Sequence, residues 1–407
     1  FVPRPSAVIK EFYEFNEKSS TKALDYLYNL SLNSNYIKRN LFEKNIFFNT
    51  QTPYGEMVIS INQSRIEKVS QTKEKLLSLE GINYPKCLLC KEAVGYHGRL
   101  DYPARDNLRI VPVTLGNKQF YFQYSPYPYF PEHSIVLNAH HIPFNMSQKT
   151  FKYMFDFVDM FPSYFIGTNA DLPIVGGGIL QHEHFHTGKY NFPISKAKTI
   201  YEESLNDTKI KLLDWPVSVI RLEGENRDAL INLATKILNV WRKYDDLESN
   251  IIACDTMPHN AITPILHFND GIYIMDLALR NNRTSEMFPL GIFHPHEEYL
   301  HIKKENIGLF EIMGYAILPK RLKEEISLLK ERILTHTTTQ EASLKKHEAW
   351  VMSFINNYSF TKDNISKIFE DEIGKVFTNM LLDCAVFKPT DTGRAHFKKF
   401  ISQIINK

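Results

Sequence analysis

Apolar residues recur at helical spacing toward both ends of the chain. Apolar side chains stand three or four positions apart, with polar ones between them, at residues 7–16, 21–30, 66–79 and 395–405. This spacing gives a helix one apolar face that packs against a core. We therefore expect a helical N-terminal segment over residues 1–80 and a helical C-terminal segment over residues 322–407.

The central part of the chain contains a series of patterns that occurs twice. Strand patterns rich in β-branched and aromatic residues, followed by a helical pattern, lie at residues 110–114, 118–124, 134–137 and 148–160. A strand pattern, a helical pattern and two more strand patterns lie at residues 218–222, 226–244, 261–268 and 272–279. Hairpins beside single helices favour an α+β fold with mainly antiparallel sheets. The repetition predicts two similar halves, at residues 81–215 and 216–321.

Composition and charge narrow the classes of protein to consider. The 407 residues are 43% hydrophobic and 23% charged, as in a globular protein large enough for more than one domain. The net charge of +2 is too small to indicate a nucleic-acid partner. No apolar run reaches the roughly 20 residues that span a bilayer, so we expect no membrane partner. Four cysteines make no disulfide framework, which favours the cytoplasm.

Three histidines alternate with other residues in the middle of the chain. His182, His184 and His186 follow an apolar segment at residues 174–180, which contains three consecutive glycines at 176–178. We expect one strand through this region, which places the three imidazoles on one face. Glycines let a backbone approach a ligand closely, so the combination suits binding a phosphate and attacking it. A metal site or a hydrogen-bonded core histidine is the alternative interpretation.

Two cysteines form a second group that carries chemistry. Cys87 and Cys90 have the Cys-x-x-Cys spacing, which most often binds zinc, with a redox dithiol as the main alternative. The strand-to-helix pattern typical of a redox dithiol is missing here. Zinc needs four ligands, so two more are expected from other parts of the chain.

Longer motifs extend these observations to a family. His-Glu-His-Phe-His at 182–186 resembles the His-x-His-x-(His/Gln) motif of the histidine-triad superfamily of nucleotidyl hydrolases and transferases. Further motifs are FQYSP at 122–126, NADLP at 169–173, RNNRTSE at 280–286, IFHPHEE at 292–298 and IKKENIG at 302–308. Together they resemble the class II (firmicute-type) galactose-1-phosphate uridylyltransferases, from about residue 3 to the C-terminus.

The resemblance implies an activity and a catalytic residue. A uridylyltransferase of galactose catabolism would move UMP from UDP-glucose to galactose 1-phosphate through a uridylyl-histidine on His184. Neutral imidazole is a competent nucleophile near pH 7 if its second nitrogen donates to a fixed acceptor, for which we expect a backbone carbonyl. Asn169, Gly177 and Gly178 would contact the phosphates. The resemblance also implies a homodimer.

Arg280 and Arg283 are candidates for holding the sugar phosphate. Both lie after the strand pattern at 272–279, in a predicted loop. A guanidinium offers a planar, bidentate donor to phosphate oxygens, which makes arginine suited to this role. Either residue alone would more often be a surface charge.

The resemblance also implies two metal sites. In related enzymes the ligands of the first correspond to Cys87, Cys90, His141 and His182, although the neighbouring His140 stands where that family has arginine. His294 and His296 form a second His-x-His in the second half, and His259 falls where related enzymes place another histidine ligand. These three residues are candidates for a second metal site or a structural polar cluster.

One position departs from the transferase pattern. The third motif position is usually glutamine in the uridylyltransferases, and here it is His186. A protonated histidine is able to act as an acid, which a glutamine is not. A nucleotidyl hydrolase or phosphorylase of the same superfamily is therefore the alternative function. A degraded relative that only binds nucleotide or sugar phosphate is a third hypothesis.

Overall fold

The computed structural model describes residues 2–63, 84–337 and 341–405. The helix predicted at residues 66–79 lies outside these ranges. Within them, no helix is both long enough and apolar enough to cross a membrane.

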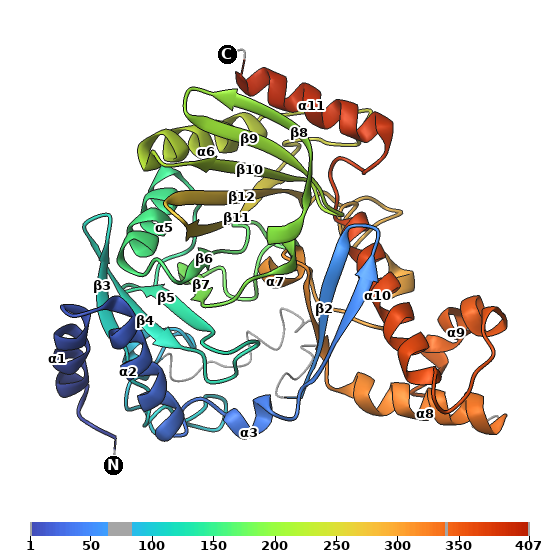
Figure 1. The fold of residues 1–407 in the computed structure, drawn as a ribbon, viewed down its shortest axis with the longest axis horizontal. Coiled ribbons are helices and arrows are strands. Elements are labelled where there is room, and N and C mark those ends of the chain that lie inside the picture. Colours follow the sequence, from blue (N-terminus) through green and yellow to red (C-terminus); the bar gives the residue numbers. More distant parts are fainter. Residues whose placement is uncertain (1, 64–83, 338–340, 406–407) are drawn as a thin grey trace.

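A ten-stranded sheet in which every neighbouring pair is antiparallel runs through the centre of the molecule (Figure 1). Its first half consists of β3 (Val111–Leu115), β4 (Lys118–Tyr124), β5 (Ser134–Asn138), α5 (Gln148–Met160), β6 (Phe165–Gly167) and β7 (His184–Gly188). Its second half consists of β8 (Lys198–Leu205), β9 (Thr208–Asp214), β10 (Val219–Gly224), α6 (Arg227–Trp241), β11 (Asn260–Asn269) and β12 (Ile272–Asn281).

The two halves have the same topology. In each half, three strands are followed by a helix and two more strands. The fifth strand lies between the third and the fourth strand of its half and pairs with both. The strand order of the whole sheet is β3-β4-β5-β7-β6-β11-β12-β10-β9-β8. The β6–β11 pair, with Ile166 opposite Leu266, joins the halves into one sheet. The α+β class with two similar halves is confirmed. The second series of strands begins with β8, upstream of the boundary expected at residue 215.

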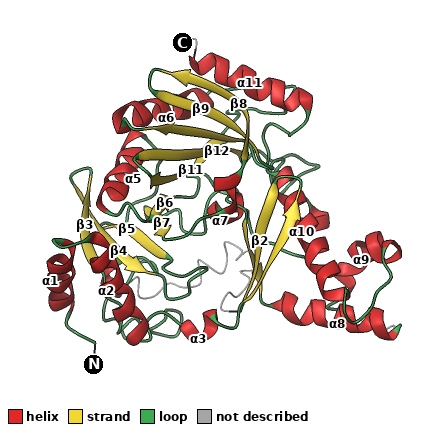
Figure 2. Cartoon of the chain, viewed as in Figure 1, coloured by secondary structure: helices red, strands yellow, loops and turns green. Residues whose placement is uncertain are grey.

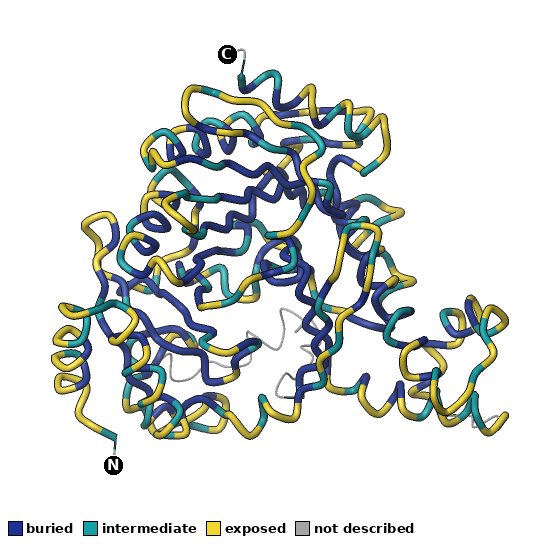
Figure 3. Tube along the Cα trace, in the orientation of Figure 1, coloured by how far each residue is buried: buried dark blue, intermediate teal, exposed yellow. Residues whose placement is uncertain are grey.

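Both faces of the central strands are buried. Leu277 and Leu279 of β12 face the core under α5 and α6, whereas Ala278 between them faces a second core on the opposite side. This is the period of two that a strand imposes. On β7, Phe185 packs into the first core, so its neighbours His184 and His186 face the opposite side. Figure 3 shows this buried centre surrounded by exposed helix faces and loops.

The helices beside the first core follow the predicted patterns. α1 (Pro5–Asn16), α2 (Ser20–Asn33), α5 and α6 bury apolar faces there, and α11 (Asp391–Ile405) packs on α6. Asn226 caps α6, since its Oδ1 accepts hydrogen bonds from the backbone N–H groups of Asp228 and Ala229, 3.1 Å away in each case.

A smaller, three-stranded sheet contributes side chains to the second core (Figure 2). It consists of β1 (Ile46–Thr52), β2 (Gly55–Asn62) and the parallel β13 (Tyr315–Pro319). The expectation of a helical N-terminal segment is therefore wrong for residues 46–62. Met57, Ile59 and Ile61 alternate into the core, and β2 obtains its second partner, β13, from far along the chain.

Four helices contribute side chains to the second core. They are α7 (Leu309–Ile312), α8 (Arg321–Thr335), α9 (Glu348–Phe354) and α10 (Ile365–Asp383), while the short α3 (Arg39–Phe42) precedes β1. α10 packs on β1, and the four-residue helix α7 leads directly into β13. The second core thereby brings α7 next to β7, where the motif histidines lie.

Candidate active site

The glycine-rich segment before the histidines is a loop. The strand predicted over residues 174–180 is wrong, because regular strand structure begins only at His184. Ile174 has φ +70°, in the left-handed region, so the chain turns there. Gly176 has no room for a side chain, since a Cβ would lie 2.5 Å from the carbonyl oxygen of Leu172. Apolar composition alone did not separate this tight turn from a strand.

His184 is held in the orientation of a nucleophile. Its Nδ1 lies 2.7 Å from the backbone carbonyl oxygen of His182, so Nδ1–H donates and the lone pair is on Nε2. Burial lowers the pKa of His184 to about 4, which keeps the imidazole neutral at pH 7. The backbone carbonyl that orients this ring is the type of acceptor expected from the sequence. His182 itself precedes the strand and does not share its face.

Asn169 connects the glycine loop to α7. Its Oδ1 accepts a hydrogen bond of 2.9 Å from the backbone N–H of Leu309. The other end of the amide, Nδ2, points at Gly177, where an added Cβ would lie only 2.7 Å away. Asn169 and Gly177 are thus brought together beside the histidine strand, and the exposed Gly178 follows them. This arrangement places the Asn169 side-chain amide against the glycine loop.

His133 is a site residue that the sequence analysis missed. It lies just before β5, and its Nε2 is 3.2 Å from Nδ1 of His186. The two ring planes are 24° apart and their centroids are 5.5 Å apart, so the rings lie nearly in one plane, end to end along this contact. No local motif marks His133. Only the pairing of β5 with β7, in which Ile135 lies opposite His186, brings it to the site.

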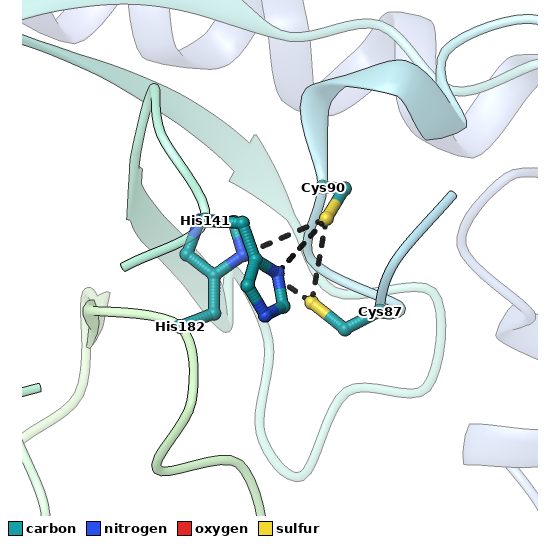
Figure 4. A group of neighbouring side chains, drawn as sticks. All are labelled: Cys87, Cys90, His141 and His182. Carbon is teal, nitrogen blue, oxygen red and sulfur yellow. Dashed lines mark hydrogen bonds between the residues drawn. The ribbon is translucent and has the colours of Figure 1, made fainter. Parts of the chain in front are cut away.

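Four side chains meet in a cluster with the chemistry of a metal site (Figure 4). The ligand atoms of Cys87, Cys90, His141 and His182 all lie within 4.8 Å of one another. The two sulfur atoms are 3.6 Å apart, and the Nδ1 atoms of His182 and His141 lie 3.2 Å from Cys87 Sγ and 3.3 Å from Cys90 Sγ respectively. Tetrahedral coordination at zinc distances separates such atoms by about 3.5–3.8 Å. The residues present therefore fit a four-coordinate metal.

Three separate parts of the chain supply this cluster. The cysteines precede a short 3-10 helix (Lys91–Ala93), His141 follows β5, and His182 precedes β7. Nε2 of His182 lies 2.9 Å from the backbone carbonyl oxygen of Asn138, which fixes the ring with Nδ1 toward the sulfurs. Such an outer hydrogen bond is typical of a histidine that binds metal.

The candidates for a second metal site do not converge. His259 contacts Asn282 and Asp255, His294 contacts Asn306, and His296 contacts Asp383. Within the described ranges, the Cys87–His182 cluster is the one group of three or more metal-ligating side chains that meet. The described residues thus provide no second cluster, because each histidine is paired with a different side chain. Pro295 also separates His294 from His296 in a non-strand segment.

Each of the two arginines has a backbone carbonyl as a hydrogen-bond partner. Arg280 is inside β12 rather than in a loop, is 1% exposed, and donates to the backbone carbonyl of Ile307 over 3.1 Å. Its Nε and Nη1 have no partner among the described residues. Arg283 lies beyond the strand and donates to the backbone carbonyl of Asn250 over 2.6 Å.

The geometry defines a class of protein. An oriented neutral imidazole is an activated nucleophile for group transfer. Its position in the His-x-His motif of residues 182–186, on a sheet whose topology occurs twice, agrees with the resemblance to nucleotidyl-transferring enzymes of the histidine-triad type. Comparisons with known proteins refine this class. Residues 1–143 match the family model for the N-terminal domain of galactose-1-phosphate uridyl transferase, and residues 157–351 match the model for its C-terminal domain.

Curated relatives agree over almost the whole chain. Galactose-1-phosphate uridylyltransferase from Clostridium acetobutylicum is 44% identical over 98% of this chain and 82% of its own length. The proteins of the same name from Caldanaerobacter subterraneus and Staphylococcus saprophyticus are 45% and 43% identical, over 98% and 99% of this chain and 80% and 82% of their own lengths. The chain belongs to the galactose-1-phosphate uridylyltransferase family.

Proposed function

We propose that this chain transfers UMP from UDP-glucose to galactose 1-phosphate through a uridylyl group bound covalently to His184. The observation that carries the proposal is the 2.7 Å hydrogen bond from His184 Nδ1 to the backbone carbonyl of His182, which leaves Nε2 as the nucleophile. Family membership supplies the identity of the substrates, because the relatives carry the name galactose-1-phosphate uridylyltransferase.

The reaction proceeds in two displacements at one phosphorus atom. Nε2 of His184 attacks the α-phosphorus of UDP-glucose, an N–P bond forms, and the P–O bond to glucose 1-phosphate breaks. Glucose 1-phosphate leaves with that electron pair. A phosphate oxygen of galactose 1-phosphate then attacks the same phosphorus, the N–P bond breaks, and UDP-galactose departs. His184 returns to its starting state, so no net proton or electron is required.

Nearby donors support the charge that develops on the phosphate oxygens. We assign this role to the Nδ2 amide of Asn169 and the backbone N–H groups around Gly177 and Gly178, because preorganised donors of this kind contribute strongly to catalysis. Asn169 follows Thr168, whose Oγ1 donates to the backbone carbonyl of His184 over 3.2 Å. Arg280 and Arg283 remain proposed contacts for the sugar phosphate. For Arg280, burial and the bond to Ile307 favour an indirect role, holding the segment that leads into α7.

Zinc is the metal we propose for the cluster of Cys87, Cys90, His141 and His182. Two thiolates and two imidazoles are a common zinc ligand set, and four protein ligands leave no open position, so the bound ion would be structural. His182 would be the link to chemistry: its side chain belongs to the cluster and its carbonyl oxygen orients His184. A second metal, held by His259, His294 and His296, has no support from their positions.

Two further properties belong to the proposal. The cytoplasm suits the chain, because Cys87 and Cys90 bind metal only as reduced thiols, and such thiols persist in a reducing compartment. A homodimer follows from the family resemblance, and sedimentation of the purified protein tests it.

The test is a coupled assay of product formation with a purified, metal-analysed protein. With UDP-glucose and galactose 1-phosphate, we expect UDP-galactose and glucose 1-phosphate in equal amounts, with parallel double-reciprocal plots that mark a ping-pong reaction. Rapid release of UMP from UDP-glucose without any acceptor would instead indicate the hydrolase alternative that His186 raises. Absence of any turnover would favour a protein that only binds its ligands.

A further inference from the structure

His133 is the hydrogen-bond partner of His186, the motif residue that stands where the transferases usually have glutamine. His186 Nδ1 faces His133 Nε2 at 3.2 Å, and the two rings lie end to end with their planes 24° apart and their centroids 5.5 Å apart. The opposite ring nitrogen of His186, Nε2, lies on the far side from His133. His184 and His186 share one face of β7, with ring centroids 5.4 Å apart, so Nε2 of His186 is the nitrogen available to a group bound at His184.

Aromatic rings hold His133 in place. Tyr129 stacks on its ring with centroids 5.1 Å apart, Phe130 lies 5.0 Å away, and the ring of Phe310 meets it edge-on at 5.2 Å. His133 is 3% exposed. Phe310, the second residue of α7, also packs on His186 at 5.2 Å. This environment fixes the rings of both histidines, and the described residues place no carboxylate against them that would stabilise a charged imidazolium.

The remaining nitrogen of His133 identifies the direction of the hydrogen bond. Nδ1 of His133 is buried and has no partner among the described residues. If Nδ1 carried the proton, an N–H donor would be left unpaired in an apolar environment, which is rare and unfavourable. With the proton on Nε2, His133 donates to Nδ1 of His186, and only an acceptor is left unpaired. The proton of neutral His186 is then on Nε2.

We propose that His133 is a positioning residue that holds His186 as a neutral imidazole with its Nε2–H directed at the transferred phosphate. His186 then acts as a hydrogen-bond donor rather than as an acid. The role rests on the proposed function, because it concerns the phosphate bound at His184. Burial also lowers the pKa of His186 well below its ordinary value, which agrees with a neutral ring. A glutamine at this position would offer an amide N–H of similar reach.

A double-mutant cycle tests the proposal. His133→Phe keeps an aromatic ring in the stack but removes the donor, and His133→Gln keeps an N–H at a similar distance. In the wild-type background we expect His133→Phe to lower kcat for transfer about 100-fold, as loss of an oriented donor does. We expect kcat of His133→Gln to be only about 10-fold below that of the wild type. We also expect His133→Phe to raise the fraction of UDP-glucose that is hydrolysed to UMP.

The informative comparison is the same substitution in a His186→Gln background. A glutamine amide has no tautomer to be selected, so His133→Phe should there change kcat less than about 3-fold relative to His186→Gln alone. An equal loss in both backgrounds would overturn the proposal, because it would indicate that His133 only supports packing. If the wild-type chain transfers no UMP, the proposed function fails and this role fails with it.

A spectroscopic measurement keeps the proposal testable if His133→Phe does not fold. In protein labelled with ¹⁵N-histidine, protonated and bare ring nitrogens have well-separated shifts, and the His186→Gln spectrum identifies the signals of His186. We expect a proton on Nε2 of His186 and a bare Nδ1. A proton on Nδ1 in an active enzyme would overturn the role of His133 while leaving the proposed transfer reaction intact.

Discussion

The buried carboxylate of Glu325 on α8 accepts hydrogen bonds from three basic side chains. Its Oε2 accepts from Arg321 Nη1 at 2.7 Å and from His347 Nε2 at 3.0 Å, and its Oε1 accepts from Lys346 Nζ at 2.5 Å. Burial alone raises the pKa of this carboxyl. The hydrogen bonds from His347 and Lys346 and the charge of Arg321 outweigh burial and lower the pKa to about 2. The cluster ties α8 to the segment that begins α9.

The pKa gives the size and the pH range of the stabilisation. A shift from 4.5 to about 2 makes the carboxylate form more stable by about 3 kcal/mol, at about 1.4 kcal/mol for each unit. The folded pKa is below the unfolded one, so the contribution is complete above pH 4.5 and is lost as the pH falls toward 2. At pH 4 the loss is already about 0.8 kcal/mol.

Glu325→Gln removes the charge but keeps the shape of the side chain. We expect the free energy of unfolding at pH 7 to fall by about 2–3 kcal/mol, with transfer activity unchanged because the cluster lies outside the histidine site. Urea titrations followed by tryptophan fluorescence suit the measurement, since Trp350 lies 5.2 Å from His301 and 6.0 Å from His347 between ring centroids.

The matched control is Glu331→Gln, an exposed residue on the same helix, for which we expect a change below about 0.5 kcal/mol. At pH 4 the difference between Glu325→Gln and the wild type should narrow by about 0.8 kcal/mol. A variant as stable as the wild type at pH 7, or a difference that widens in acid, would refute this reasoning.

Two further predictions concern the site. Gly177→Ala places a Cβ 2.7 Å from Nδ2 of Asn169, so we expect it to displace the amide and lower kcat about 100-fold without lowering the melting temperature. An equally large effect of Gly177→Ala in an Asn169→Ala background would contradict this, because the amide would already be gone. Cys87→Ser removes one of four metal ligands, so elemental analysis should find the metal lost and the free energy of unfolding lower by about 3 kcal/mol or more. An equally stable, active and metal-free variant would show that the cluster needs no metal.

The sequence predicted elements well where the signal is local. The helix at 148–160 has the bounds of α5, and the strand at 118–124 has those of β4, because both have clear periodicity and end at turn-forming residues. The cysteine pair followed from its spacing. The other two residues of the cluster, His141 and His182, needed the family resemblance, since nothing local connects them to residues 87–90.

The rest depends on partners far along the chain or on backbone detail. The β1–β2 hairpin is completed by β13, and no local pattern reveals that pairing. The loop at residues 174–180 has a strand-like composition, and its turn comes from backbone conformations that composition does not specify. His133 enters the site only because β5 pairs with β7. The second His-x-His has residue types that bind metals, but His294 contacts Asn306 and His296 contacts Asp383 instead of meeting at one point.

The most direct test of the account is mass spectrometry of the protein after brief exposure to UDP-glucose. We expect the mass to increase by one uridylyl group, peptide mapping to place that group on His184, and the adduct to disappear when galactose 1-phosphate is added. His184→Gly should form no adduct. A uridylyl group on another residue, or transfer to galactose 1-phosphate at the wild-type rate by His184→Gly, would contradict the central claim.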